Sequence, residues 1–242
     1  MGSAVLPRIF AGVRGRFLTV SARLHIGRHV ARPEILFLDR ADAGRALAGW
    51  IDPLPDPDAV VFALPRGGIP VGRPLADLLG CELRPALVRK LPIPSNPEMG
   101  FGAVAADGTV RLNQAVIESF RISRDTADRV VAQVRGEVER RGTAYPGGWP
   151  LPDMSGRCVW LVDDGLATGL TMLAAADMLR AHQVARVTVA IPCSPADSLT
   201  RVAAEVDDVW CLVSQAGHPF AVASFYADFH DLTDAEVREA LR

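Results

Sequence analysis

The sequence predicts an α/β protein built on a doubly wound, mostly parallel sheet. From Ala59 to Val213, apolar runs rich in β-branched residues alternate with segments whose apolar residues recur at helical spacing. Runs that are apolar throughout are typical of strands buried on both faces of a parallel sheet. The chain has 242 residues, of which 49% are hydrophobic, so it is long enough to bury a substantial core.

The first predicted elements lie between residues 59 and 113. AVVFALP (59–65) is a strand candidate, and IPVGRPLADLLG (69–80) has the spacing of a short helix that ends at its last glycine. ELRPALVRK (82–90) is the next strand candidate, and a loop rich in proline and glycine follows it. Asp107-Gly108 then predicts a hairpin, because Asp-Gly favours the tight turn that joins two antiparallel strands.

The second half contains one long helix candidate, three strands and two further helices. SRDTADRVVAQVRGEVERRG (123–142) starts with Ser and Asp and places its valines on one face, as an amphipathic helix does. The strand candidates are CVWLVDD (158–164), ARVTVAIPC (185–193) and DDVWCLV (207–213). The helices between them are TMLAAADMLRAH (171–182) and SPADSLTRVAAEV (194–206), the second with Ser194 as N-cap and Pro195 as first helical residue.

Composition constrains the class of protein. The formal net charge is −2, which argues against binding to nucleic acid or a membrane surface. Six arginines and no acidic residue precede Glu34, and no apolar run there suits an export signal. We therefore expect residues 1–34 to be a basic, flexible extension and residues 35–242 to be the folded domain. Four cysteines without C-x-x-C spacing predict reduced thiols in a cytoplasmic protein.

The stretch VWLVDDGLATGLTM (159–172) places two adjacent acids and G-x-x-T-G-x-T after an apolar strand. Ligands of open parallel sheets bind at the carboxyl ends of the strands. Gly165 and Gly169 allow sharp turns, so the following amides can converge on an anion at the start of a helix. The expected phosphate donors are the amides of Ala167, Thr168, Gly169, Leu170 and Thr171 and the two threonine hydroxyls.

The two acids, Asp163 and Asp164, suit the sugar of a phosphorylated ligand. They lie roughly one sugar length from the expected phosphate position by strand geometry. Two carboxylates there can accept hydrogen bonds from vicinal hydroxyls, and these donors or a divalent cation relieve their mutual repulsion. The stretch therefore predicts a site for a 5-phosphoribosyl group.

This stretch resembles the 5-phosphoribosyl 1-diphosphate motif of the type I phosphoribosyltransferases, which has four apolar residues, two acids and G-x-x-T-G-x-T. The resemblance runs from about Phe37 to the end, and FLDRADAGRALA (37–48) resembles the beginning of a bacterial phosphoribosyltransferase-like group. It implies the α/β core of that family with a small hood built from loop, hairpin and terminal segments.

Two further stretches resemble parts of the same family. LPRGGIPVG (64–72) resembles the loop that binds the diphosphate, with Arg66, Gly67 and Gly68 as binding residues and Pro65–Arg66 at the position of a cis peptide. VRKLPIPSNPEMGFGA (88–103) resembles the mobile loop that closes over the site. The resemblance implies that Arg89 and Lys90, the only lysine of the chain, reach the leaving diphosphate.

The carboxyl-terminal stretch HPFAVASFYADFHDL (218–232) resembles, more loosely, the base-binding segment of the hypoxanthine-guanine enzymes. Phe220 matches the aromatic residue that stacks on the base, although a core position is an equal alternative. The strand VTVAIPCSP has no lysine at the position where those enzymes contact a 6-oxo purine. This departure argues against a specific hypoxanthine or guanine enzyme.

The implied function is transfer of the 5-phosphoribosyl group from 5-phosphoribosyl 1-diphosphate to a nitrogenous base, a purine being one candidate, with release of pyrophosphate. Mg²⁺ would be carried by the substrate, near Asp163 and Asp164.

Two alternatives stay open: a regulator that binds the diphosphate without catalysis, and a sugar-phosphate hydrolase with Asp163 as nucleophile. The implied partners are small molecules, with a homodimer as one candidate assembly. The implied catalytic residues are Arg66, Arg89, Lys90, Asp163 and Asp164.

Overall fold

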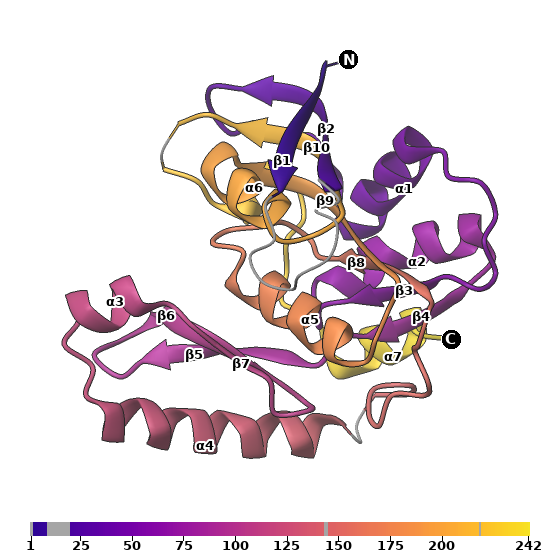
Figure 1. Ribbon diagram of the computed structural model, residues 1–242. Coiled ribbons are helices and arrows are strands. Elements are labelled where there is room, and N and C mark those ends of the chain that lie inside the picture. The colour runs from indigo at the N-terminus through magenta and orange to yellow at the C-terminus, as the bar shows by residue number, and fades with distance from the viewer. Residues whose placement is uncertain (1, 9–19, 143–144, 218) are drawn as a thin grey trace.

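The computed structural model describes residues 2–8, 20–142, 145–217 and 219–242 (Figure 1). Its main sheet has the strand order β1-β2-β10-β9-β8-β3-β4, in which β1 is antiparallel to β2 and the others run parallel. The predicted mostly parallel sheet is confirmed. The strands are β1 (Gly2–Arg8), β2 (Val20–Val30), β3 (Val60–Ala63), β4 (Glu82–Pro85), β8 (Cys158–Val162), β9 (Arg186–Pro195) and β10 (Asp208–Gln215).

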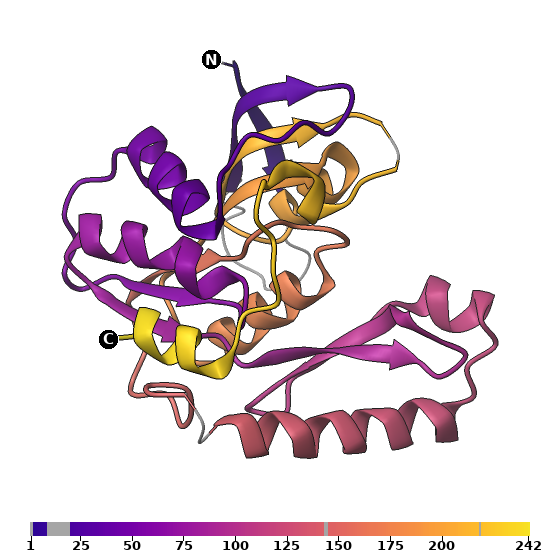
Figure 2. The same ribbon diagram turned by 180° about the vertical axis from the view of Figure 1, so that it is seen from behind.

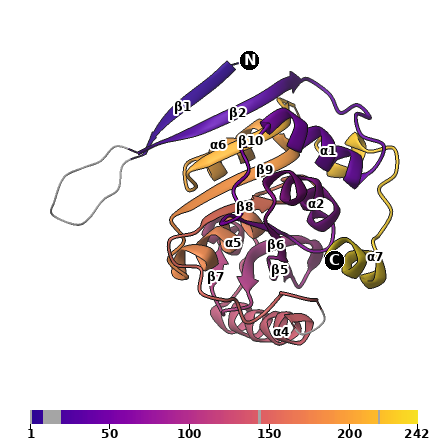
Figure 3. The ribbon, with the colours of Figure 1, turned by 90° about the vertical axis from the view of Figure 1, so that its right-hand side faces the viewer.

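Helices cover both faces of the main sheet, as a doubly wound fold requires (Figure 3). Val159, Val187 and Val209 of three adjacent strands pack with one helix layer, whereas Val61 and Ala63 pack with the other. Among the described residues, no helix is long and apolar enough to cross a membrane. The first layer consists of α5 (Leu170–Ala181) and α6 (Ala196–Ala203), and the second of α1 (Arg40–Ile51) and α2 (Gly68–Leu79).

Helix ends follow the local sequence with one exception. α2 ends at Gly80, whose φ of 68° is a left-handed conformation that glycine adopts readily. α6, however, begins after Pro195, so the prediction of Ser194 as its N-cap is wrong. β9 continues through Ser194, and the hydroxyl of this buried residue donates to the Pro195 carbonyl instead of capping the helix.

A second sheet and two helices form a projection that we call the arm, residues 88–142 (Figure 1). The segment after Lys90, predicted to be a loop, is instead a β-hairpin. Its glycine residues lie where neighbouring strands approach each other closely. A Cβ at Gly102 would lie 2.3 Å from the Arg111 carbonyl oxygen on the next strand. The hairpin predicted at Asp107-Gly108 is confirmed. The arm contains β5 (Val88–Ile93), β6 (Asn96–Ala105), β7 (Val110–Leu112), α3 (Gln114–Ser119) and α4 (Arg124–Gly142).

The arm has an apolar interior of its own and a polar contact with the main domain. α4 buries Val134 and Val138 in the same apolar cluster as Leu91 and Phe101 of the sheet, which confirms the predicted amphipathic helix. On the other side, Arg111 of β7 donates to Asp177 of α5 at 2.8 Å and to Glu205 at 2.5 Å. These contacts tie β7 to α5 and to the segment after α6.

Part of the predicted basic extension belongs to the main sheet. β2 pairs in parallel with β10, from Arg23 opposite Asp208 to Val30 opposite Gln215. Residues 2–8 and 20–30, predicted to belong to a flexible extension, are therefore strands of the main sheet. The high arginine content obscured the alternation of apolar and polar residues that is typical of a strand. Leu24 and Ile26 pack into the core on one face of β2. Residues 9–19 of the predicted extension lie outside the described residues.

The chain after β10 returns across the carboxyl edge of the sheet. It forms η1 (Val222–Phe225), pairs Tyr226 with Phe37, and ends in α7 (Asp234–Ala240) against α2 (Figure 2). A capping box of Thr233 and Glu236 starts α7. This segment brings residues of the amino-terminal and carboxyl-terminal parts of the domain together beside Asp164.

Candidate functional site

The predicted phosphate loop lies between β8 and α5 with free backbone donors. In the part of the chain that the structure describes, no group accepts a hydrogen bond from the amides of Ala167, Thr168 or Gly169. Two contacts hold the loop: the Leu166 amide donates to the Cys193 carbonyl at 2.9 Å, and the Ser198 hydroxyl donates to the Ala167 carbonyl at 2.6 Å. We call residues 165–171 the cradle. Exposed amides at a helix start suit an anion.

A cavity of about 380 Å³ lies between the cradle and the arm. The cradle contributes Thr168 and Thr171, and Asp163 lies beside them. From the arm come Lys90, Met99 and Asn113, among others. The cavity therefore joins an anion-binding end to Asp163 and, on the arm, to Lys90 and Glu98.

Lys90 and Arg89 lie on opposite faces of β5, as neighbouring strand residues do. Lys90 lines the cavity, and its ammonium group donates to the Glu98 carbonyl oxygen at 2.5 Å. Its aliphatic part passes Gly100, where a Cβ would lie 2.4 Å from Lys90 Cγ. Arg89 instead forms an ion pair with Glu137 of α4. The structure thus brings Lys90 to the cavity and places Arg89 inside the arm.

The predicted diphosphate loop lies against the two acids. Its Pro65–Arg66 peptide is cis, as the resemblance implied. A Cβ at Gly67 would lie 1.9 Å from Asp164 Oδ2, and one at Gly68 would lie 2.7 Å from the Val162 carbonyl oxygen. Both positions therefore need glycine. Arg66 is exposed, and no described residue receives a hydrogen bond from its side chain.

The two acids have different surroundings. Asp163 Oδ1 accepts from the Asp164 amide at 2.9 Å, whereas Asp164 Oδ2 accepts from Arg40 Nε at 2.7 Å. Burial raises the pKa of Asp163, and the negative charge of Asp164 raises it further. Burial also raises the pKa of Asp164, but the hydrogen bond from Arg40 opposes this shift. The hydroxyl of Tyr226 donates to the Asp164 carbonyl at 2.5 Å.

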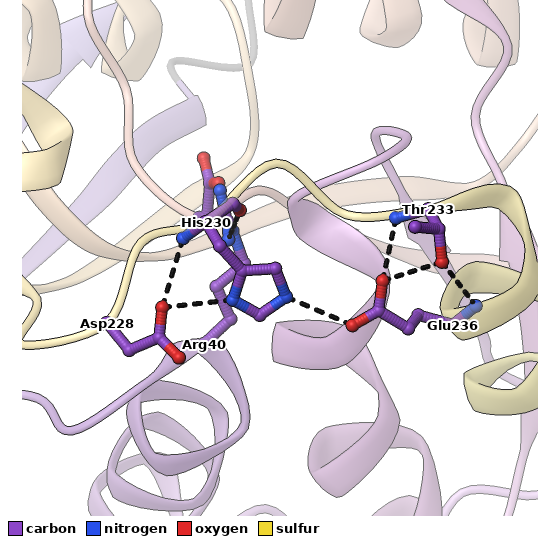
Figure 4. Close-up of polar contacts among 6 residues, drawn as sticks. Arg40, Asp228, His230, Thr233 and Glu236 are labelled. Atoms are coloured by element: carbon purple, nitrogen blue, oxygen red, sulfur yellow. Dashed lines mark hydrogen bonds and ion pairs between the residues drawn. The ribbon is translucent and has the colours of Figure 1, made fainter.

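Arg40 is a site residue that the sequence predictions missed. Only 8% of it is exposed, and its Nη1 donates to the His230 carbonyl at 2.9 Å (Figure 4). Its guanidinium carbon lies 3.8 Å from the Phe229 ring centroid. One signal was available. Arg40 is the first residue of α1, where the helix dipole disfavours a positive charge, so a partner elsewhere is needed.

Phe220 of the carboxyl-terminal segment is not among the residues that line the cavity. Its half-buried ring lies 5.5 Å from that of Phe225, within the apolar cluster around Phe37 and Val213. This position matches the core alternative for Phe220. Farther along the chain, His230 lies between the carboxylates of Asp228 and Glu236, at 2.9 and 3.0 Å (Figure 4).

Three comparisons with known proteins bear on this geometry. Residues 37–230 match the family model described as the phosphoribosyl transferase domain. The chain belongs to this family. The match spans the cradle, the acid pair, the Gly67-Gly68 turn and Arg40.

The relatives include a Mycobacterium tuberculosis protein whose name gives phosphoribosyl transferase as a provisional description. It is 39% identical over 202 residues, which are 84% of this chain and 45% of that protein. The chain thus matches less than half the length of this relative. The crystal structure of TT1426 from Thermus thermophilus is 36% identical, with a TM-score of 0.70 over 86% of this chain and 98% of that one.

Proposed function

We propose that this phosphoribosyl transferase domain binds 5-phosphoribosyl 1-diphosphate and transfers its phosphoribosyl group to a nitrogenous base, releasing pyrophosphate. The observation that carries the proposal is the single cavity that joins the cradle, Asp163 and Lys90. An anion cradle alone would suit any phosphate ester. A carboxylate for sugar hydroxyls and a cation across the cavity suit a ligand with phosphate groups at both ends.

Each part of the ligand has a proposed partner. The amides of the cradle and the hydroxyls of Thr168 and Thr171 bind the 5-phosphate, and Asp163 accepts hydrogen bonds from the ribose. Lys90, together with Arg66 beside the Gly67-Gly68 turn, balances the charge of the diphosphate. Arg89 stays paired with Glu137 and supports the arm.

The reaction exchanges two bonds at C1 of the ribose. The bond from C1 to the diphosphate oxygen breaks and its electron pair leaves with pyrophosphate, while a base nitrogen donates a lone pair to C1. Positive charge develops on the sugar and negative charge on the leaving group, so Lys90 contributes more in the transition state than in the bound substrate. The protein's share of catalysis is therefore positioning and charge stabilisation.

The residues present suit Mg²⁺ bound partly through the substrate. The described residues contain no group of three or more histidine, cysteine, aspartate or glutamate side chains that could hold a metal by themselves. Mg²⁺ is commonly held by one or two carboxylates plus phosphate oxygens, and Asp163 is the carboxylate of this kind that lines the cavity. When bound, the ion supplies Lewis-acid and template chemistry to the diphosphate.

Calorimetry and a base screen test this proposal together. We expect 5-phosphoribosyl 1-diphosphate with Mg²⁺ to bind the protein, and one or more bases, tested with purines first, to cause pyrophosphate release. Asp163→Asn should weaken binding, whereas Asp128→Asn on the exposed side of α4 is the matched control. Binding without release for any base would identify a regulator. Absence of binding would reject the proposal.

A further inference from the structure

The two adjacent acids do not present their carboxylates to the same place. Asp163 lines the cavity beside the cradle. The Asp164 side chain is 15% exposed and is held between Arg40 Nε and the turn at Gly67. The Asp164 carboxylate therefore has a charged partner inside the protein, whereas no described cation pairs with Asp163.

Three contacts fix the guanidinium group of Arg40. Nε donates to Asp164, Nη1 donates to the His230 carbonyl, and the Phe229 ring lies against the guanidinium face at 3.8 Å. The side chain is 10% exposed, so water does not compete strongly for these donors. Arginine suits this task because its planar group can donate in two directions and stack at the same time.

We propose that Arg40 is a positioning residue that holds the Asp164 carboxylate against the Gly67 turn. Its effect on ligand binding rests on the proposed function, whereas the placement of Asp164 does not. Arg40 acts through Asp164, because its Nε donates to that carboxylate and Arg40 is not among the residues that line the cavity. The arrangement also resolves the repulsion between neighbouring acids, since Arg40 neutralises one of them.

The charge balance explains why Asp164 needs this partner. Burial raises the pKa of Asp164, and Arg40 is the group that opposes this shift most strongly. Without Arg40, the carboxyl group would take up a proton more readily and lose its fixed orientation. The turn at Gly67 would then lose the carboxylate that packs against it.

A double-mutant cycle on binding of 5-phosphoribosyl 1-diphosphate tests whether Arg40 acts through Asp164. We expect Arg40→Met to weaken the affinity by roughly ten- to a hundredfold, as loss of a supporting partner does at other charged sites. The double variant with Asp164→Asn should bind about as well as Arg40→Met alone. Arg45→Met, on the same helix, is the control and should bind normally, since the exposed Arg45 side chain forms an ion pair with half-buried Asp42. Fully additive losses would overturn the proposal.

A ligand-free measurement keeps the two proposals separate. Carboxyl NMR titration should show a higher pKa for Asp164 in Arg40→Met than in the wild type, and no change in Arg45→Met. If Arg40→Met does not fold, Arg40→Lys replaces it and should show the same shift, smaller in size, because lysine keeps the charge but not the planar fork. An unchanged Asp164 pKa would overturn the positioning role. Failure of the wild type to bind the diphosphate would reject only the proposed function.

Discussion

The cradle and the network around Asp164 are neighbours in space but are built in opposite ways. The cradle uses consecutive residues, and its donors are backbone amides at the start of α5. The Asp164 network uses side chains from three distant parts of the chain, with 124 residues between Arg40 and Asp164 and 62 between Asp164 and Tyr226. The first binds the ligand and the second holds the parts that bind it. Their responses to substitution should therefore differ.

The largest expected effect comes from Gly67→Ala, which should disturb the Asp164 network and leave the cradle intact. The added Cβ would lie 1.9 Å from Asp164 Oδ2, and Arg40 prevents that carboxylate from moving aside freely. The clash should break the buried ion pair between Arg40 and Asp164, which costs about 3–5 kcal/mol. The melting temperature should therefore fall, and binding of 5-phosphoribosyl 1-diphosphate should be lost. Inorganic phosphate should still bind the cradle. Gly136→Ala is the control, since nothing lies within 4 Å of its Cβ. Equal losses of both ligands would contradict this separation.

Lys90→Ala tests whether the chemistry also needs the arm. The substitution removes a cation from the cavity wall but touches neither the cradle nor the Asp164 network. A charge-assisted contact of about 1.5–3 kcal/mol implies a loss of turnover on the order of ten- to a hundredfold, with a smaller change in KM. Lys90→Arg should recover part of the rate. Steady-state kinetics with the accepting base measure both constants, and wild-type turnover in both variants would exclude a catalytic Lys90.

Thr168→Val should have a smaller effect that is confined to the cradle. The exposed hydroxyl lines the cavity, and the free amide donors remain in the variant. Loss of one hydrogen bond of about 1 kcal/mol should weaken phosphate binding about fivefold. Calorimetry with inorganic phosphate measures this change, and Thr200→Val on exposed α6 is the control. An unchanged affinity would mean that the amides alone hold the anion.

The smallest effect concerns His230, whose backbone supports Arg40. Hydrogen bonds to Asp228 and then Glu236 raise the pKa of His230 above 6.5, while bonds from Thr233 lower the pKa of Glu236 to about 2. A raised histidine pKa contributes stability below pH 6.5 that is lost as the pH rises through the folded value. The cluster is exposed, so His230→Gln should lower the melting temperature by only about 2 °C at pH 6 and less at pH 8. A larger effect at pH 8 would contradict this sign.

The alternation of strands and helices, the cradle, the acid pair and the Gly67-Gly68 turn were all predictable from the sequence. Each depends on residues close together in the chain, so residue spacing alone determines the local structure. The β5–β6 hairpin and strand β2 were predicted wrongly. Glycine and proline suggested a loop where β5 pairs with β6, and arginine hid β2, which forms by pairing with the distant strand β10.

Only the tertiary structure decided which charged side chains face the cavity. Arg89 and Lys90 are neighbours in sequence, yet the pleat of β5 sends one to α4 and the other to the cavity. Asp163 and Asp164 are neighbours as well, and only the position of Arg40 separates their surroundings. Local spacing fixes backbone shape, whereas the partner of a buried charge depends on segments that meet only when the chain has folded.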